Sequence, residues 1–189
     1  TLKYPAVKQV VMQDSVAYLL MKRPESSSGM MIVVDLEKPG SPRELARVEV
    51  PGDASSLFFV NSQLVLYASQ RGFVGHNRVY LYDVDDYTRI RLRGSEESPY
   101  LGEHFLQYDN YVLVPELRGG LSVYDFSRPL IYEQVAFLET PVLGHLARSG
   151  SMVFAAGLGG ELFAVDLKDP AQPALSTAAE ELAHAAFFL

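Results

Sequence analysis

The chain has 189 residues, of which 48% are hydrophobic and 21% are charged, and its formal net charge is −7. These values are typical of one globular domain with a sizeable core and exclude a disordered chain. An acidic chain without a run of Lys and Arg argues against a nucleic-acid partner, and no apolar run is long enough to cross a membrane. The absence of cysteine excludes disulfides and thiolate metal sites.

Residues 6–51 introduce a pattern of four predicted strands. A polar turn at residues 13–15 precedes an apolar strand over Val16–Met21, and a loop containing Gly29 follows that strand. The next strand, Met31–Leu36, contains Asp35 near its end. A proline-rich turn over residues 37–42 then leads to a fourth strand that ends near Pro51.

The same order of strand and turn signals returns three more times along the chain. The later units cover residues 52–99, 100–141 and 142–181, and their third strands end at Asp83, Asp125 and Asp166. Counted from Asp35, the four aspartates are 48, 42 and 41 residues apart. Four short strands in each unit of about 40–50 residues are typical of β-propeller blades.

We therefore predict an all-β fold, a β-propeller of four-stranded antiparallel blades in a single domain over residues 1–189. Stacking between blades covers both faces of each sheet, which explains continuous apolar runs in place of strict alternation. The chain opens at the end of a fourth strand, and residues 182–189 align with the start of another first strand. We expect the four blades to belong to a larger ring, or to be completed by other segments or by self-association with a second copy. The helix formers in Ala178–Ala186 leave a terminal helix as an alternative.

The four aspartates are predicted to have a structural role. An Asp at the end of a strand accepts hydrogen bonds from the backbone N–H groups of the turn that follows it. Because catalysis seldom needs the same residue in every blade, we interpret these aspartates as turn caps. Asp83, Asp85 and Asp86 lack the spacing of a calcium loop and are interpreted as a solvated turn.

Two segments resemble a known repeat family. Met31–Pro42 and Leu162–Pro173 are similar to the LVIVD repeat of bacterial β-propellers. Gly144-His145 and Val165-Asp166 are distantly similar to the WD40 pattern, although the chain has no Trp. The LVIVD resemblance implies a bacterial protein that is periplasmic or extracellular.

Three of the four histidines share one repeat position. His104, His145 and His184 fall at the start of a predicted first strand, where the first two units have Gln9 and Leu57. One hypothesis is a ring of imidazoles that binds copper or zinc at the central channel. The alternative is that each side chain bonds the backbone or a neighbouring blade.

The longest loop, Ser69–Asn77, offers a candidate binding surface. It carries Arg71, Phe73 and His76, and Arg118 lies in the corresponding loop of the next unit. Loops on a rigid scaffold often hold binding residues, although an ordinary solvated loop explains the same composition.

The sequence shows no hydrolase elbow, zinc-protease motif or phosphate loop. We therefore predict a non-catalytic scaffold that binds a protein partner or an extended ligand through these loops and needs no cofactor. The alternative is a metal-dependent or redox enzyme with copper or zinc on the shared histidines. A further alternative is a segment that only completes the ring of a larger protein.

Overall fold

The computed structural model describes Tyr4, residues 6–21, 28–51, 54–69 and 77–98, Leu101, and residues 105–116, 119–141, 143–157 and 159–177. The chain divides into two compact units, Thr1–Tyr100 and Leu101–Leu189, and each is described by itself. None of the described residues lies in a helix, so they include no helix that could cross a membrane.

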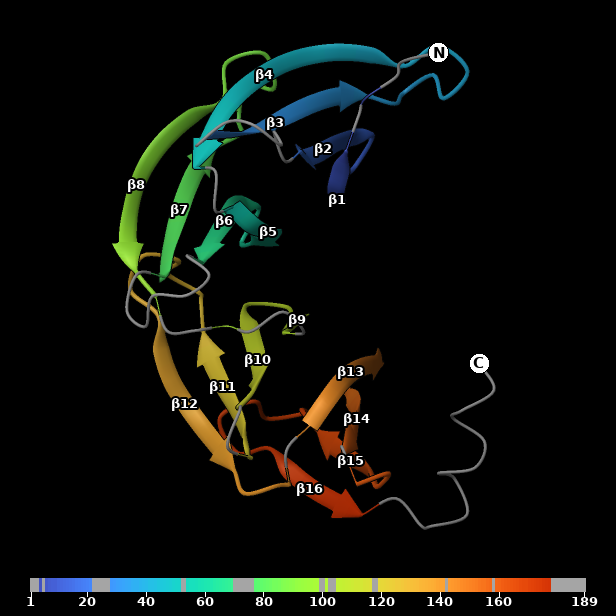
Figure 1. The fold of residues 1–189 in the computed structure, drawn as a ribbon, viewed down its shortest axis with the longest axis vertical. Helices are drawn as coiled ribbons and strands as arrows, with labels where there is room; N and C mark the ends of the chain where they lie inside the picture. The colour runs from blue at the N-terminus through green and yellow to red at the C-terminus, as the bar shows by residue number, and fades with distance from the viewer. Residues whose placement is uncertain are drawn as a thin grey trace. The chain divides into compact units, whose positions relative to one another are not determined.

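The first unit contains two four-stranded antiparallel sheets, blade 1 and blade 2, in which the strands pair in chain order. Figure 1 shows blade 1 in blue and cyan and blade 2 in green. Blade 1 consists of β1 (Val7–Gln13), β2 (Val16–Met21), β3 (Ser28–Asp35) and β4 (Arg43–Pro51). Blade 2 consists of β5 (Ala54–Val60), β6 (Gln63–Ser69), β7 (Asn77–Asp83) and β8 (Arg91–Glu97).

The second unit repeats this plan in blade 3 and blade 4, again with strands that pair in chain order. Blade 3 consists of β9 (Leu106–Tyr108), β10 (Tyr111–Pro115), β11 (Leu121–Asp125) and β12 (Glu133–Leu138). Blade 4 consists of β13 (Leu143–Ser149), β14 (Met152–Gly157), β15 (Leu162–Asp166) and β16 (Ala174–Thr177). The architecture is therefore all-β and of the β-propeller type, with four antiparallel blades, as predicted.

A two-residue turn joins the first and second strands of every blade. Its first residue has positive φ in each case, between 48° and 60°, at Asp14, Asn61, Asp109 and Gly150. Asn, Asp and Gly are the residues that adopt this conformation at least cost, and such turns match the twist of a hairpin. These are the polar turns that the sequence predicted.

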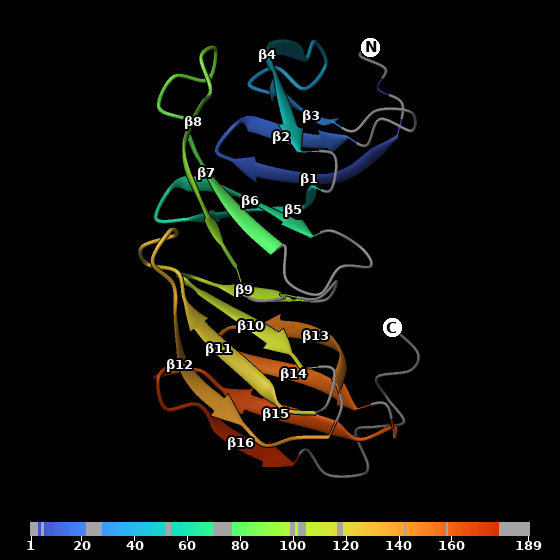
Figure 2. The same cartoon turned by 60° about the vertical axis from the view of Figure 1, so that its left-hand side comes forward.

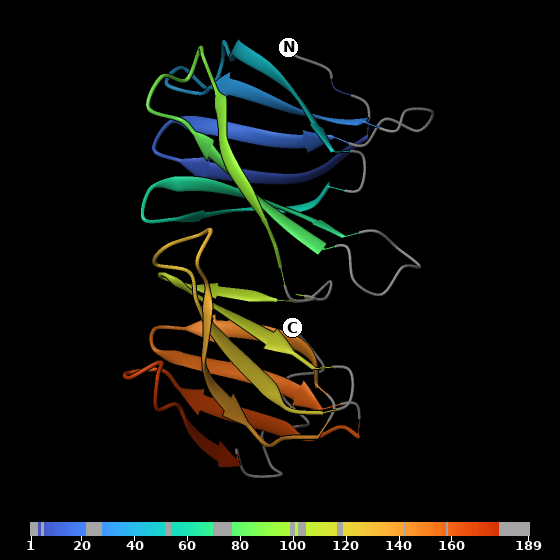
Figure 3. The same ribbon diagram turned by 90° about the vertical axis from the view of Figure 1, so that its left-hand side faces the viewer.

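Each blade has a turn end and a loop end, which Figures 2 and 3 show from two sides. At the turn end, the hairpin between the first two strands meets the turn between the last two strands. A backbone hydrogen bond joins these two turns in blade 1, where the N–H of Leu36 donates to the Ser15 carbonyl (2.8 Å). In blade 3 the N–H of Phe126 donates to the Asn110 carbonyl (2.7 Å), and in blade 4 the N–H of Leu167 donates to the Ser151 carbonyl (2.9 Å). The connections between second and third strands leave from the opposite, loop end.

The core of each unit lies between its two blades. In the first unit, Tyr18 and Val33 of blade 1 pack in one cluster with Leu64 and Leu66 of blade 2. The Tyr18 ring meets Phe59 edge to face, with ring centroids 5.3 Å apart. The second unit buries Leu113 and Val123 of blade 3 against blade 4 residues such as Val153 and Val165. Each sheet is thus stabilised by burying apolar surface against its neighbour.

Candidate functional site

The four aspartates that end the third strands all cap the following turn. In each, Oδ1 accepts a hydrogen bond from the backbone N–H two residues later. The distances are 2.8 Å for Asp35 and Glu37, 3.1 Å for Asp83 and Asp85, 2.7 Å for Asp125 and Ser127, and 3.0 Å for Asp166 and Lys168. The predicted structural role is therefore confirmed in every blade.

Three of these carboxylates also face a cation. Asp35 lies 3.4 Å from Arg43, Asp83 lies 2.6 Å from Arg93, and Asp166 lies 3.2 Å from Lys168. Each cation is more than half exposed, so these ion pairs add little stability. The backbone N–H of Lys168, followed by its ammonium group, lowers the pKa of Asp166. Asp166 is consequently ionised at neutral pH and is poorly suited to general acid catalysis.

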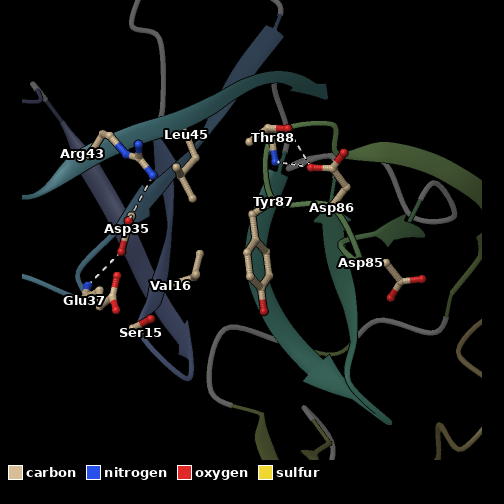
Figure 4. A pocket seen from close by; sticks show the side chains of 10 residues that line it. All are labelled: Ser15, Val16, Asp35, Glu37, Arg43, Leu45, Asp85, Asp86, Tyr87 and Thr88. Atoms are coloured by element: carbon tan, nitrogen blue, oxygen red, sulfur yellow. Dashed lines mark hydrogen bonds and ion pairs between the residues drawn. The ribbon is translucent and has the colours of Figure 1, made fainter.

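An open groove of about 410 Å³ lies at the turn end of the first unit, between blades 1 and 2 (Figure 4). Its walls come from the first hairpin and last turn of blade 1, from β4, and from the last turn of blade 2. The lining residues are Ser15, Val16, Asp35, Glu37, Arg43, Leu45, Asp85, Asp86, Tyr87 and Thr88.

The groove is lined by more negative than positive side chains. Asp86 is held by the backbone N–H and the hydroxyl of Thr88, at 2.9 and 2.7 Å, and this bonding lowers the pKa of Asp86. Asp35 caps its turn and faces Arg43. Among the described contacts, neither the Glu37 nor the Asp85 carboxylate receives a hydrogen bond, so the fold uses neither carboxylate as an acceptor.

Sequence reasoning treated this turn of blade 2 as solvated, and the structure places it at the rim of the groove. Glu37, Arg43 and Tyr87 are among the lining residues that the sequence did not single out, and Tyr87 also packs against the core of the unit. An aromatic residue inside a polar turn, directly after Asp85 and Asp86, was the available signal.

One of the predicted loop and metal residues falls in the described part of the chain. His145 is an exposed residue near the start of β13. Arg71, Phe73, His76 and Arg118 lie outside the described residues, as do His104, His184, the predicted strand at 184–189 and the alternative helix at 178–186. Their roles in binding and in a copper or zinc site stay predictions. The described residues contain no group of three His, Asp or Glu side chains that could hold a metal.

Strand pairing corrects one assignment at the shared histidine position. Val60 pairs with Gln63 as Gln13 pairs with Val16, so the residue of blade 2 that corresponds to Gln9 is Ser56 and not Leu57. The same count from the Ser149–Met152 pair gives His145 in blade 4. Sequence spacing located the corresponding residue of blade 2 by counting back from Asp83. That count gave Leu57 because blade 2 has one more residue than blade 1 between its first hairpin and the aspartate of its third strand.

Blade 1 shows what a side chain at this position can do. The Gln9 amide Nε2 donates to the Leu57 carbonyl (2.9 Å), and its Oε1 accepts from the Leu57 N–H (2.7 Å). Gln9 therefore joins the first strands of two adjacent blades. This contact agrees with the interpretation that the repeat position serves contact between blades.

The chain matches no protein-family model and no curated protein. The similarity to LVIVD and WD40 repeats consequently remains a resemblance of short motifs, and the fold is established by the strand pairing alone.

Proposed function

We propose that this chain is a non-catalytic propeller scaffold that binds a protein or another extended ligand. The observation that carries the proposal is the turn-end groove, which is open and has two carboxylates, Glu37 and Asp85, that the fold does not use. A ligand that lies in this groove would present a guanidinium or ammonium group to them.

The state of the conspicuous acidic residues supports binding over catalysis. The repeated aspartates are occupied by turn caps, and hydrogen bonds outweigh the effect of burial on the carboxylate pKa values that depart from their ordinary range. Those of Glu44, Asp86 and Asp166 are all lowered. A general acid needs the opposite shift to remain protonated at neutral pH.

The loop end is the second proposed contact surface. Arg71, Phe73 and His76 in the loop of blade 2 combine cationic and aromatic groups, which suit an acidic or aromatic segment of a partner, and Arg118 supplies a cation in the corresponding loop of blade 3. A blade of this kind would bind a cationic segment at its turn end and an acidic segment at its loop end.

Two matched peptides test the proposal. Titration with Gly-Arg-Gly-Arg-Gly should shift the amide NMR signals of Glu37 and residues 85–88, and titration with Gly-Glu-Phe-Glu-Gly should shift those of residues 71–76. Glu37→Gln with Asp85→Asn should abolish only the first response, and Arg71→Gln with Phe73→Ala only the second. If neither peptide produces saturable shifts, the binding role is wrong.

A further inference from the structure

The first strand of blade 1 exposes an apolar strip. Val10 is 51% exposed and Met12 is 54% exposed. They pair with Leu19 and Ala17, and Ala17 belongs to an apolar cluster with Ile32 and Val34 that is separate from the core shared with blade 2. The strip therefore lies on the face of blade 1 that is turned away from blade 2.

Strand pairing identifies what this face corresponds to in the next blade. Counted back from the hairpin, Val10 and Met12 correspond to Leu57 and Phe59. Leu57 and Phe59 belong to the face by which blade 2 packs on blade 1, and Leu57 is only 1% exposed. Leu57 is thus buried where blade 1 covers it, whereas Val10, at the same repeat position in blade 1, is half exposed.

The second unit uses the same positions. Val153 and Val165 of blade 4, which correspond to Ala17 and Val34, are buried against blade 3. Leu146 corresponds to Val10 and packs on the same core. Two independent pairs of blades therefore show that this face receives the opposite face of another blade.

Blade 4 carries the complementary surface. Phe154 and Ala164 correspond to Tyr18 and Val33, the residues by which blade 1 packs on blade 2. They pair with each other on the side of blade 4 away from Val153 and Val165. Ala164 is already buried (6% exposed) and Phe154 is partly buried, so Phe154 is the accessible part of this surface, and it corresponds to the residue by which blade 1 meets the first strand of blade 2.

We propose that blade 1 of one copy of this chain docks against blade 4 of a second copy. The contact reproduces the part of the two interfaces within the units that the first strand makes, since Ala17, Ile32 and Val34 of blade 1 are already buried. Tyr4 partly covers the outer half of the blade 1 face and donates to Glu44 (2.8 Å), so the docked blade contacts the β1 side of the face.

Corresponding residues specify the contact in detail. Because Tyr18 meets Phe59 within the first unit, Phe154 of one copy meets Met12 of the other, and a thioether against an aromatic ring is a favourable pair. Because Gln9 bonds the Leu57 backbone, His145 of one copy faces the Val10 backbone of the other. A head-to-tail contact of this kind closes into a ring or continues as a longer assembly.

Sedimentation velocity of the full chain over a range of concentrations tests the proposal. The wild-type chain should associate reversibly, and Met12→Glu should sediment as a monomer because it places a charge in the contact. Leu92→Glu is the matched control, since Leu92 is also 54% exposed but lies on the last strand of blade 2, and it should associate like the wild type. A wild-type chain that stays monomeric at all concentrations would overturn the proposal.

Cross-linking tests the geometry without changing a buried residue. The chain has no cysteine, so Val10→Cys and His145→Cys introduce single thiols at two exposed positions. A short bis-maleimide should join the two variants, mixed in equal amounts, into a heterodimer in higher yield than it forms either homodimer. A chain that carries both cysteines and cross-links only within itself would contradict docking of a second copy.

Discussion

The two units build the same contact between blades with different side chains. In the first unit, Phe59 near the end of the first strand of blade 2 meets the Tyr18 ring. The corresponding residue in blade 4 is Arg148, whose guanidinium lies 4.4 Å from the centroid of the Tyr108 ring and 3.7 Å from Asp109. An aromatic pair in the first unit and a cation–π contact in the second unit thus both join adjacent blades near the first hairpin.

The difference teaches that strand register determines which repeat positions meet between two blades. At the edge of the contact, near the first hairpin, the chemistry of the side chains varies between the units. In the middle of the contact the side chains are buried and hydrophobic in both units. Leu64 and Val153 occupy one such central position, and both are fully buried. Tyr18 and Leu113 occupy another, and both are fully buried although one side chain is aromatic and the other aliphatic. Truncation of a fully buried residue between the blades should therefore be costly in both units, whereas mutations at the edge of the contact should have different effects in the two units.

Truncation at the centre should have the largest effect. Leu64→Ala and Leu113→Ala should each lower the free energy of unfolding by about 2–5 kcal/mol, because each opens a cavity between blades. Urea denaturation measures the loss, and Leu92→Ala should change it by less than about 0.5 kcal/mol. A small loss at either position would contradict close packing between the two blades of that unit.

A backbone constraint in blade 3 should have the next largest effect. Gly120 has a φ of +101°, and a Cβ atom there would overlap the Phe137 ring. Gly120→Ala should therefore destabilise the protein by about 1–3 kcal/mol. Gly40 has no neighbouring heavy atom within 4 Å, and Gly40→Ala should leave the thermal midpoint unchanged or raise it slightly.

The Tyr18 hydroxyl should be dispensable. Among the described residues it is the one buried side-chain polar atom without a hydrogen-bond partner, and burial raises the pKa of Tyr18. Tyr18→Phe should stabilise the protein by about 1–2 kcal/mol, since it removes an unpaired polar group. Tyr4→Phe should instead cost about 0.5–1.5 kcal/mol, because Tyr4 donates to Glu44. Equal effects of the two variants in chemical denaturation would contradict this difference.

Turn caps should matter through their acceptor atom and not through their charge. Asp125→Ala should cost about 0.5–1.5 kcal/mol because it removes the hydrogen bond from the Ser127 N–H. Asp125→Asn keeps an acceptor oxygen and should retain most of the stability. A loss as large for Asn as for Ala would assign the effect to charge.

The smallest effect concerns pH. The folded pKa of Asp166 lies below its ordinary value of 3.8, chiefly because the Lys168 N–H donates to the carboxylate. This carboxylate therefore contributes stability that is present above the unfolded pKa and is lost as the pH falls through the folded pKa. Asp166→Asn should flatten the acid limb of a plot of stability against pH, and an unchanged acid limb would contradict the shift.

Most of the fold could be predicted because local signals repeat. The strand predicted over Val16–Met21 coincides with β2, and every predicted turn at the first hairpin was found. The turn-capping role of the aspartates follows from the chemistry of Asp at a strand end, and all four confirm it.

The site was harder to predict because it depends on contacts between blades. Sequence spacing placed Leu57 one residue out of register, since only strand pairing reveals the extra residue in blade 2. The groove is lined by Glu37 of one blade and Asp85 of the next, which are far apart along the chain. A count of residues does not contain that information.

The most direct test of the propeller account is a set of nuclear Overhauser contacts across the first unit. The account predicts cross-peaks between the Tyr18 and Phe59 rings, and between the Gln9 side-chain amide and the backbone of Leu57. The absence of both, together with contacts between β1 and a strand other than β2 and β5, would contradict face-to-face stacking of the blades.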